Sequence, residues 1–409
     1  MKRTAKINLL HRDAPNSQQQ TGSSPAAMTL GQLQRNYQAI LQTRAIYYPV
    51  AYQFLRKLGA GRQGEVFLGL RQGARGCITE HAIKVFDPGI YRSPEEYWSD
   101  MGRIASQISQ LQRLQSPNIV TRHTYEETYG IGYVQMEAVD GIDLRSFLSR
   151  EHLDIAMKRS TASEMAEFTR HMFRLDGNRI CMRPGLTLYI LRGVLRGLER
   201  LHAMNFLHSD VKPANIMFDR LGFVKLIDFG RAVTAGEELS FLFGSPLYMS
   251  IETHEQKPGG PDSDLFSVGL VALEMLRGRP LLDDPEASLE TLLAVKRGLA
   301  TTLDSLLPTE VLDSADIVSM IRKLLHADPA DRYSDAKEAD AGTEGLGKID
   351  KRLVQEGQDT DYERVLSDYL SKLVDPQTNR IEIPQSQSPT SSLALMRDAR
   401  AVPRGAPYA

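Results

Sequence analysis

The sequence predicts an α+β fold of two lobes within residues 47–345: a small β-rich lobe at about residues 51–139 precedes a larger, mostly helical lobe at about residues 140–345. Two patterns predict this order. Short runs rich in β-branched and aromatic residues fill the first part, as is typical of strands. From about residue 186 the apolar residues recur with helical spacing, as in LTLYILRGVLRGLERLHAM.

Four runs predict the strands of the small lobe: YQFLRKL, EVFLGL, HAIKVF and GYVQMEAV. One helix interrupts them and begins at SPEE, where Ser93 suits the capping position and Pro94 suits the first turn. The two acids that follow meet the positive end of the helix dipole. Apolar residues then recur with helical spacing at Trp98, Met101, Ile104, Ile108, Leu111 and Leu114.

Polar segments flank the two lobes and interrupt the larger one. Residues 1–46 and 376–409 are rich in Gln, Ser, Thr and Pro. We expect disordered tails there, because such segments cannot bury enough apolar surface to offset the entropy lost on ordering. Residues 150–183 are polar and irregular, and the pattern predicts an insertion.

A helical C-terminal extension is predicted at residues 346–375. One face of its second half collects apolar residues at Tyr362, Val365, Leu366, Tyr369, Leu370 and Leu373. We expect this helix to pack back onto the larger lobe. The alternative is that this helix, or one of the tails, binds a partner protein.

Composition excludes several classes of protein. The 409 residues carry 51 acidic and 49 basic side chains, so the charge gives no general case for binding nucleic acid. No apolar run approaches the ~18 residues of a membrane span. The two cysteines, Cys77 and Cys181, make no disulfide framework and favour a reducing compartment. We therefore expect a cytoplasmic protein without a membrane span; the basic start MKRTAKINLLHR leaves an organellar transit peptide as the alternative.

A glycine-rich segment, LGAGRQGEV at residues 58–66, lies between two predicted strands. Glycines let backbone amides approach phosphate groups closely. A dinucleotide-binding turn would need a helix directly afterwards, whereas the sequence continues as a strand. On the next strand Lys84 is either an exposed edge charge or a point charge aimed at phosphate. The glycine-rich segment before it favours phosphate.

The motif HSDVKPAN at residues 208–215 is followed thirteen residues later by DFG at residues 228–230. Phosphoryl transfer needs a carboxylate that accepts the hydroxyl proton, oxygen ligands for magnesium, and cations that offset the spreading charge. Asp210, Asn215, Asp228 and Lys212 supply these groups within a short span.

With these motifs, residues 51–345 resemble the eukaryotic-type serine/threonine protein kinase family. The resemblance implies the bilobal kinase fold, with one regulatory helix in the small lobe, and transfer of the γ-phosphoryl of ATP to serine or threonine hydroxyls of protein substrates. It makes Asp210 the catalytic base. It implies that Lys212 steadies the γ-phosphate, that Lys84 contacts the α- and β-phosphates, and that Asn215 and Asp228 hold Mg²⁺.

The resemblance also assigns a nucleotide-binding set. Met136 stands at the gatekeeper position, residues 137–139 form the hinge that bonds adenine, and Asp143 meets the ribose. The whole set is Leu58, Gly59, Gly61, Gly64, Val66, Ala82, Lys84, Glu137, Val139 and Asp143.

Later matches separate protein kinases from small-molecule kinases of similar fold, which are a further alternative. GSPLYM with SIE, at residues 244–252, resembles the end of the activation segment. Asp264 matches the buried aspartate of the family, and Arg332 is expected to pair with Glu252.

Two residues depart from the family pattern. Ser209 replaces an arginine that normally neutralises a phosphorylated activation loop, which argues against control through the loop hydroxyls of Thr234 and Ser240. Gln107 stands where a glutamate should pair with Lys84. Because a neutral amide cannot form that ion pair, a nucleotide-binding pseudokinase scaffold with little catalysis is the alternative function.

Overall fold

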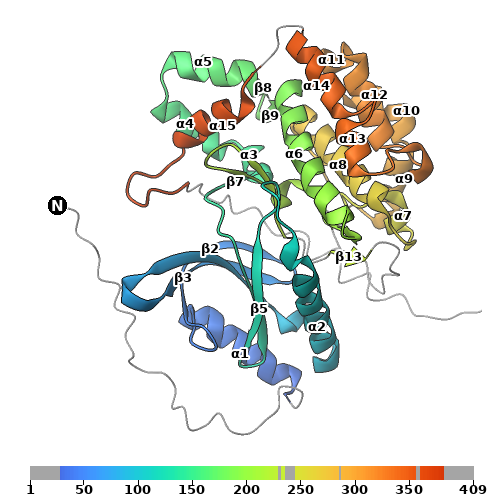
Figure 1. Cartoon of the computed structure of the whole chain (residues 1–409). Coiled ribbons are helices and arrows are strands. Elements are labelled where there is room, and N and C mark those ends of the chain that lie inside the picture. Colours follow the sequence, from blue (N-terminus) through green and yellow to red (C-terminus); the bar gives the residue numbers. More distant parts are fainter. Residues whose placement is uncertain (1–27, 229–231, 235–244, 285–286, 356–359, 382–409) are drawn as a thin grey trace, which may run out of the picture. The chain divides into compact units, whose positions relative to one another are not determined.

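The computed structural model describes residues 28–228, 232–234, 245–284, 287–355 and 360–381 (Figure 1). The chain divides into two compact units. The first unit comprises Met1–Gln112 and Arg122–Ala138, and the second comprises Arg113–Thr121 and Val139–Ala409. A β-rich unit followed by a mostly helical one confirms the predicted α+β order.

The first unit is built on a six-stranded antiparallel sheet in the order β1-β2-β3-β4-β6-β5. Four of its strands match the four predicted runs, whereas the short first strand and the strand over residues 122–128 were not predicted. Their bounds are β1 (Ala45–Ile46), β2 (Tyr52–Gly61), β3 (Gly64–Gln72), β4 (Ile78–Phe86), β5 (Arg122–Thr128) and β6 (Ile131–Met136), with short 3₁₀ helices at η3 (Ala74–Gly76) and η4 (Pro88–Ile90).

Helix α2 (Pro94–Gln110) packs against β5 in this unit, and η5 (Leu111–Arg113) follows it. The predicted cap is present, since the Ser93 hydroxyl accepts a hydrogen bond from the Glu96 amide at 3.3 Å. Its buried face includes Met101, Ile104 and Ile108, as the spacing predicts. Tyr97 is fully buried beside them, and its hydroxyl accepts a hydrogen bond from the Gly132 amide at 2.8 Å.

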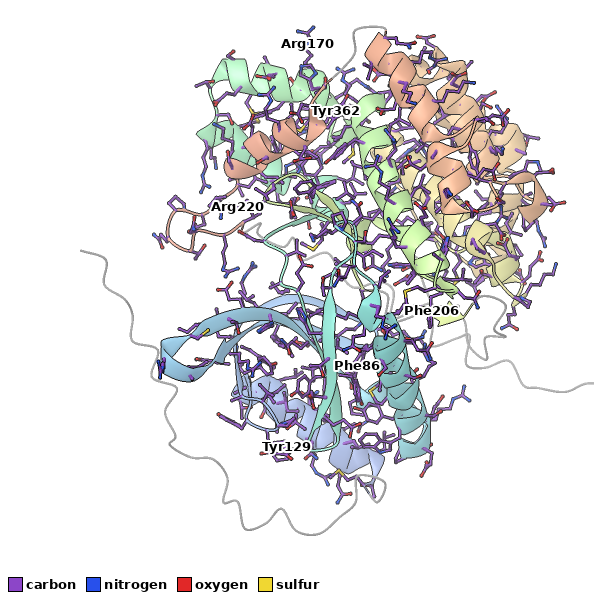
Figure 2. The ribbon with its side chains drawn as sticks, viewed as in Figure 1. Phe86, Tyr129, Arg170, Phe206, Arg220 and Tyr362 are labelled. Carbon is purple, nitrogen blue, oxygen red and sulfur yellow. The ribbon has the colours of Figure 1, made fainter. Side chains whose placement is uncertain are left out.

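An amphipathic helix, α1 (Leu30–Thr43), corrects the prediction of a disordered tail through residue 46. Its apolar residues Leu33, Tyr37 and Ile40 are buried against η4 and β6. Asn36 donates a hydrogen bond to the carbonyl of Tyr129, which lies on the β5–β6 turn (Figure 2). The glutamines of this helix lie on its solvent face, and three apolar residues at helical spacing are enough to fix it.

The second unit is organised around α6 (Pro184–His202) and α8 (Pro261–Arg277) (Figure 1). Residues 263–277 of α8 are all buried, so this helix is covered on every side and lies at the centre of the core. The remaining helices of its body are α3 (Leu144–Phe147), α7 (Ile251–His254), α9 (Leu289–Arg297), α10 (Leu299–Leu306), α11 (Thr309–Leu312), α12 (Ala315–Leu324), α13 (Ala336–Ala341) and α14 (Leu346–Gln355), with η6 (Pro213–Asn215) and η7 (Pro329–Asp331).

Two small antiparallel sheets position the loops of this unit. One has the order β12-β11-β7, from β7 (Gly141–Asp143), β11 (Ile216–Asp219) and β12 (Val224–Leu226). The other pairs β10 (Phe206–Leu207) with β13 (Val233–Thr234). The first sheet brings the strand that precedes Asp228 alongside the strand that follows Asn215.

Residues 150–183, predicted to be irregular, form two helices and a hairpin. The helices are α4 (Glu151–Arg159) and α5 (Ala162–His171), and the hairpin pairs β8 (Phe173–Asp176) with β9 (Arg179–Met182). Their apolar side chains, among them Leu153 and Phe168, are part of the main core. The segment is regular rather than irregular. Its helices are short and their polar faces dominate the composition, so the sequence pattern does not show them.

Helix α15 (Tyr362–Ser371) packs onto this insertion. Tyr369 is fully buried, and its hydroxyl lies 2.6 Å from Nδ1 of His152 on α4. The chain beyond it stays packed as far as Ile381, which is 3% exposed and bridges to Val374, so the packed chain extends past the predicted boundary at residue 376. The rest of the two predicted tails, residues 1–27 and 382–409, lies outside the described residues.

None of the helices in the described part of the chain has the length and apolar character needed to cross a membrane.

Candidate active site

Asp264 of α8 holds the loop that carries Asp210 in place. The Asp264 carboxylate, 2% exposed, accepts hydrogen bonds from the backbone amides of His208 and Ser209, both at 2.8 Å. His202 donates a third at 2.9 Å. Burial raises the pKa of Asp264, but the hydrogen bond and charge of His202, with the hydrogen bond from the His208 backbone amide, outweigh burial and hold the pKa below its ordinary value.

His208 is a structural member of this loop rather than an acid or base. Its Nδ1 accepts from the Asp210 amide at 3.3 Å, and its Nε2 donates to the Ile227 carbonyl at 3.2 Å. Both bonds suit a neutral ring. Burial lowers the pKa of His208, which agrees with that assignment.

The Asp210 carboxylate is held by donors on both oxygens. Oδ2 accepts from Lys212 Nζ at 2.8 Å and from Asn215 Nδ2 at 3.1 Å. Oδ1 accepts from the Ser245 amide at 3.0 Å. Lys212 also donates to the Ser245 hydroxyl at 3.1 Å, so one cation links the carboxylate to the segment at residue 245. These charge-assisted bonds suit an ionised carboxylate in a fixed orientation.

Asn215 and Asp228 are neighbours because of the β11–β12 pairing. Ile216 pairs with Leu226, and the Ile227 amide donates to the Asn215 carbonyl at 2.9 Å. The Asn215 side-chain nitrogen is bonded to Asp210, so its amide oxygen points the other way. An amide oxygen beside a carboxylate is a donor set that fits Mg²⁺.

Two residues of this region have unusual backbone angles. Ser209 has a φ of 61° and Asp228 a φ of 54°, in the left-handed region that residues other than glycine adopt rarely. Such outliers gather at functional sites, where the surrounding structure holds them. Of the other expected residues, Phe229, Gly230, Ser240 and Gly244 lie outside the described residues, as does the side chain of Thr234.

Asp143 lies at the end of β7, paired with Met217 of β11. Its carboxylate caps α3 by accepting from the Ser146 amide at 2.9 Å and the Ser146 hydroxyl at 2.8 Å. Val139 precedes β7 in the same unit.

The glycine-rich segment forms the β2–β3 hairpin of the first unit. Gly64 has a φ of 140°, and a Cβ there would lie 1.9 Å from the Val85 carbonyl oxygen, so this position requires glycine. A Cβ at Gly59 or Gly61 would meet no described atom within 4 Å. Packing within the described part of the chain therefore does not require glycine at these two positions.

Lys84 is 5% exposed and lies between Val66 of β3 and Val134 of β6 in the sheet register. Its Nζ donates to Oε1 of Gln63, at the tip of the glycine-rich hairpin, at 3.1 Å. This contact excludes the edge-charge interpretation. Of the other expected nucleotide contacts, Leu58 lies on β2, and Ala82 pairs with Met136 just before Glu137.

Two further contacts in the second unit involve residues 246–252, which directly follow Ser245. The predicted pair is confirmed: Arg332 donates to both oxygens of Glu252, at 2.8 and 2.9 Å. No sequence pattern indicates Lys296, which is fully buried on α9 and donates to the carbonyls of Pro246 and Met249 at 2.7 and 2.6 Å. Burial lowers the pKa of Lys296 to about 7.

Comparisons with known proteins agree with this arrangement. Residues 52–341 match the family model described as the protein kinase domain. The chain is 27% identical over 298 residues to serine/threonine-protein kinase PrkC of Bacillus subtilis (strain 168), covering 71% of this chain and 39% of that protein. It is 27% identical over 290 residues to calcium/calmodulin-dependent protein kinase type 1B of Rattus norvegicus, covering 69% and 72%.

A third relative is MAP kinase kinase kinase wis4 of Schizosaccharomyces pombe, 27% identical over 234 residues, which are 54% of this chain and 14% of that protein. The chain thus spans well under half the length of some of these relatives. The family match nevertheless covers most of the chain and every motif described above. From this match we conclude that the chain belongs to the protein kinase domain family.

Proposed function

We propose that this chain is an ATP-dependent protein serine/threonine kinase in which Asp210 is the catalytic base. The observation that carries the proposal is the Asp210 carboxylate, which three donors orient at 2.8, 3.0 and 3.1 Å. Lys212 lies two residues after it, as in the serine/threonine branch of the family.

In the proposed reaction the substrate hydroxyl oxygen attacks the γ-phosphorus of ATP. The new O–P bond forms as the bond from the γ-phosphorus to the β,γ-bridging oxygen breaks, and ADP leaves. The hydroxyl proton passes to Asp210. Lys212 offsets negative charge on the transferred group, and its contact with Ser245 ties this cation to the segment that receives the substrate.

Asn215 and Asp228 are the proposed Mg²⁺ ligands, because an amide oxygen and a carboxylate are oxygen donors that suit this ion. When bound, the ion neutralises charge on the phosphate oxygens. We assign nucleotide binding in the first unit to Lys84 with Leu58, Gly59, Gly61, Gly64, Val66, Ala82 and Glu137, and in the second unit to Val139 and Asp143.

Gln107 supports one competing function, a nucleotide-binding scaffold with little catalysis. This glutamine is 5% exposed on α2. The resemblance to the family assigns it to the position where a glutamate pairs with the lysine. The oriented Asp210 and its donors favour catalysis over this alternative.

One experiment separates the two functions. Phosphate transfer from radiolabelled ATP to a generic protein substrate is measured with Mg²⁺, together with ATP binding, for the wild type, Asp210→Asn and the surface control Asp368→Asn on α15. We expect Asp210→Asn to lower kcat by ~10²–10⁴-fold, since the amide cannot accept the proton, while ATP affinity stays near the wild-type value.

Phosphoamino-acid analysis of the product should give phosphoserine and phosphothreonine. Wild-type turnover in Asp210→Asn would remove Asp210 as the base. A wild-type protein that binds ATP but transfers no phosphate would establish the scaffold instead.

A further inference from the structure

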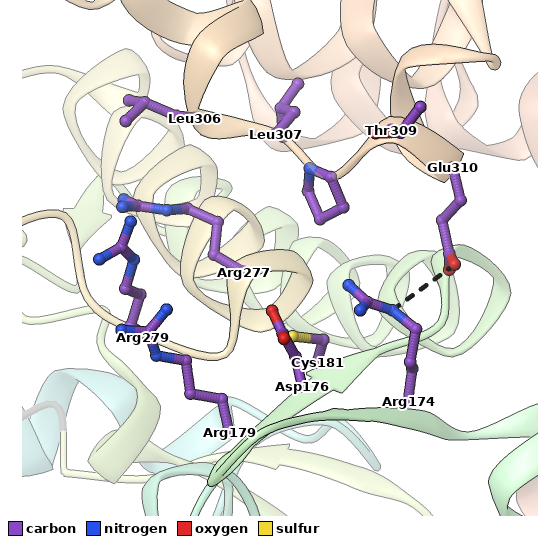
Figure 3. Close-up of a pocket in the computed structure, with 11 residues that line it drawn as sticks. Arg174, Asp176, Arg179, Cys181, Arg277, Arg279, Leu306, Leu307, Thr309 and Glu310 are labelled. Carbon is purple, nitrogen blue, oxygen red and sulfur yellow. Dashed lines mark ion pairs between the residues drawn. The ribbon is translucent and has the colours of Figure 1, made fainter.

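A pocket of about 520 Å³ lies in the second unit, away from the catalytic loop (Figure 3). The β8–β9 hairpin, the end of α8 and the segment that joins α10 to α11 enclose it. Asp264 and Arg277 lie on the same helix, thirteen residues apart. At ~1.5 Å per residue the pocket is therefore about 20 Å from the Asp264 anchor of the catalytic loop.

Arginine dominates the wall of this pocket. Arg174, Arg179, Arg277 and Arg279 line it, against the two acids Asp176 and Glu310. The wall therefore carries two positive charges in excess. Figure 3 shows the guanidinium groups of Arg277, Arg279 and Arg179 on one side of the pocket, across from Arg174.

Two carboxylates on or beside this wall, Glu310 and Asp283, already pair with arginines. Glu310 pairs with Arg174 at 3.6 Å and with Arg183 at 3.2 Å. Arg279 pairs with Asp283, whose side chain is 60% exposed. Because these pairs are at the surface, each is weak and open to exchange.

Arg277 is the unusual member. It is only 8% exposed, and its guanidinium makes one long hydrogen bond, 3.4 Å, to the Pro280 carbonyl. Within the described part of the chain, no carboxylate lies within ion-pair distance of it. Burial, followed by the charge of Arg279 and then that of Arg179, lowers the pKa of Arg277. The charges of Asp283 and Glu274 offset only part of that shift, so the cation is incompletely compensated.

A buried guanidinium without an ion-pair partner is costly, and an anion that enters the pocket would relieve that cost. The planar guanidinium fork matches phosphate oxygens in two-point hydrogen bonds. A phosphate monoester carries ~1.5–2 negative charges near neutral pH, which matches the excess on the wall; a carboxylate carries only one.

The shape of the pocket indicates what the phosphate is attached to. The pocket is large enough for a peptide side chain and its neighbours rather than a lone phosphate ion. Leu306, Leu307 and Pro308 line the side formed by the α10–α11 segment. This apolar wall beside the arginines suits an apolar residue next to the phosphorylated one.

We propose that this pocket binds a phosphorylated serine or threonine of a protein segment, with an adjacent apolar side chain against residues 306–308. The site is separate from the catalytic loop and does not depend on the proposed catalysis. It would recruit proteins that already carry a phosphate, by the arginine-cluster mode of phosphopeptide recognition.

The test uses the full chain and a fluorescein-labelled degenerate peptide mixture with a fixed phosphoserine flanked by leucine. Anisotropy measures its binding, that of the same mixture with unphosphorylated serine, and displacement by inorganic phosphate. We expect the phosphorylated mixture to bind at least tenfold more tightly than the unphosphorylated one, and inorganic phosphate to displace it only at far higher concentration.

Substitutions then place the binding in the pocket. Arg179→Gln/Arg279→Gln should weaken binding at least tenfold, and Arg277→Met should abolish it. The matched control is Arg170→Gln, an exposed arginine on α5 (Figure 2), which should bind as the wild type does. The double variant removes only surface charge, so it keeps the test valid if Arg277→Met fails to fold.

Phosphate transfer by Arg179→Gln/Arg279→Gln should remain at the wild-type level, which separates this site from the catalytic one. Equal binding of both peptide mixtures, or full binding by the double variant, would overturn the proposal. Displacement by inorganic phosphate as effective as by the phosphopeptide would reduce the pocket to a small-anion site and overturn it as well.

Discussion

Replacing Arg332 by alanine removes the buried cation that joins α7 to the chain after η7. The wild-type guanidinium is fully buried and donates to both oxygens of Glu252, at 2.8 and 2.9 Å. It also donates to the carbonyls of His326 at 2.8 Å, Asp262 at 3.2 Å and Ala327 at 3.3 Å, and it lies 4.7 Å from the centre of the Phe266 ring.

The loss of stability in Arg332→Ala comes from the Glu252 carboxylate, which stays buried without its ion-pair partner. In Arg332→Ala the Glu252 carboxylate, 8% exposed, keeps only the Ser263 hydroxyl, at 2.6 Å, as a donor among the described side chains. Breaking a buried pair from one side costs ~3–5 kcal/mol. For a unit of this size, at ~2–4 °C per kcal/mol, the melting temperature should fall by about 6–20 °C.

The loss of stability in Arg332→Ala should also depend on pH, in a direction that can be measured. Burial raises the pKa of Glu252, but the hydrogen bonds and charge of Arg332 outweigh it and hold the pKa below its ordinary value. In the wild type this carboxylate therefore adds stability above the unfolded-state pKa of ~4.3, and that stability is lost as pH falls through the lower folded pKa. Without Arg332 burial raises the pKa instead, so the loss in stability should be largest near pH 7 and shrink toward pH 4.

The assay is thermal unfolding followed by circular dichroism at pH 7 and pH 4.5. Arg322→Ala is the matched control, because Arg322 pairs with Asp304 at the surface, where an ion pair contributes ~0–1 kcal/mol. Glu252→Gln in the Arg332→Ala background should restore part of the stability by removing the stranded charge. An unchanged melting curve in Arg332→Ala, or a loss that grows as pH falls, would refute the reasoning.

Three further changes give distinct outcomes. Gln107→Glu should retain or raise kcat/KM for phosphate transfer, because a carboxylate there can pair with Lys84; a large loss would mean that the position is not the ion-pair position. Lys296→Met should lower kcat/KM for the protein substrate about tenfold while ATP affinity stays unchanged. It leaves two buried carbonyls without a donor, which costs ~1–3 kcal/mol, and a tenfold change lies within that range. Because the pKa of Lys296 is about 7 when folded and ~10.4 when unfolded, the wild type should gain stability from pH 7 to 10, and calorimetry should find that gain absent in Lys296→Met. Tyr369→Ala should cost ~3–5 kcal/mol in urea unfolding by leaving a cavity beside His152, and Tyr369→Phe less; equal stability of both variants with the wild type would contradict the packing of α15.

Local patterns predicted the parts of the molecule that local chemistry determines. The Ser93 cap, the strands around Lys84 and the spacing from Asp210 to Asn215 all lie within short segments, and the structure has the same elements there. The pairing of Arg332 with Glu252, eighty residues apart, was expected only through resemblance to the family. Nothing in either local sequence indicates it.

The missed features depend on distant partners. Lys296 lies in the last turn of α9, where a lysine is normally solvated, and it is buried because two carbonyls from residues 246 and 249 face it. Composition does not reveal helix α1, because its solvent face is glutamine and asparagine. The burial of Leu33 depends on packing against the sheet, which the local sequence does not show. The arginine pocket joins three segments whose separation in the sequence exceeds any local pattern.

The docking of α15 has a consequence for how the chain is made. His152 and Tyr369 are 217 residues apart in the sequence. At ~5–20 residues per second, the ribosome adds Tyr369 about 10–40 s after His152. During that interval the aromatic rings of Phe147, Phe168 and Phe173, which contact Tyr369 in the folded protein, have no cover from α15. A chain cut at residue 341, where the family match ends, would keep them in that state permanently. Recombinant domains of this protein should therefore extend through Ile381, and chains that stop earlier should collect in the aggregated fraction.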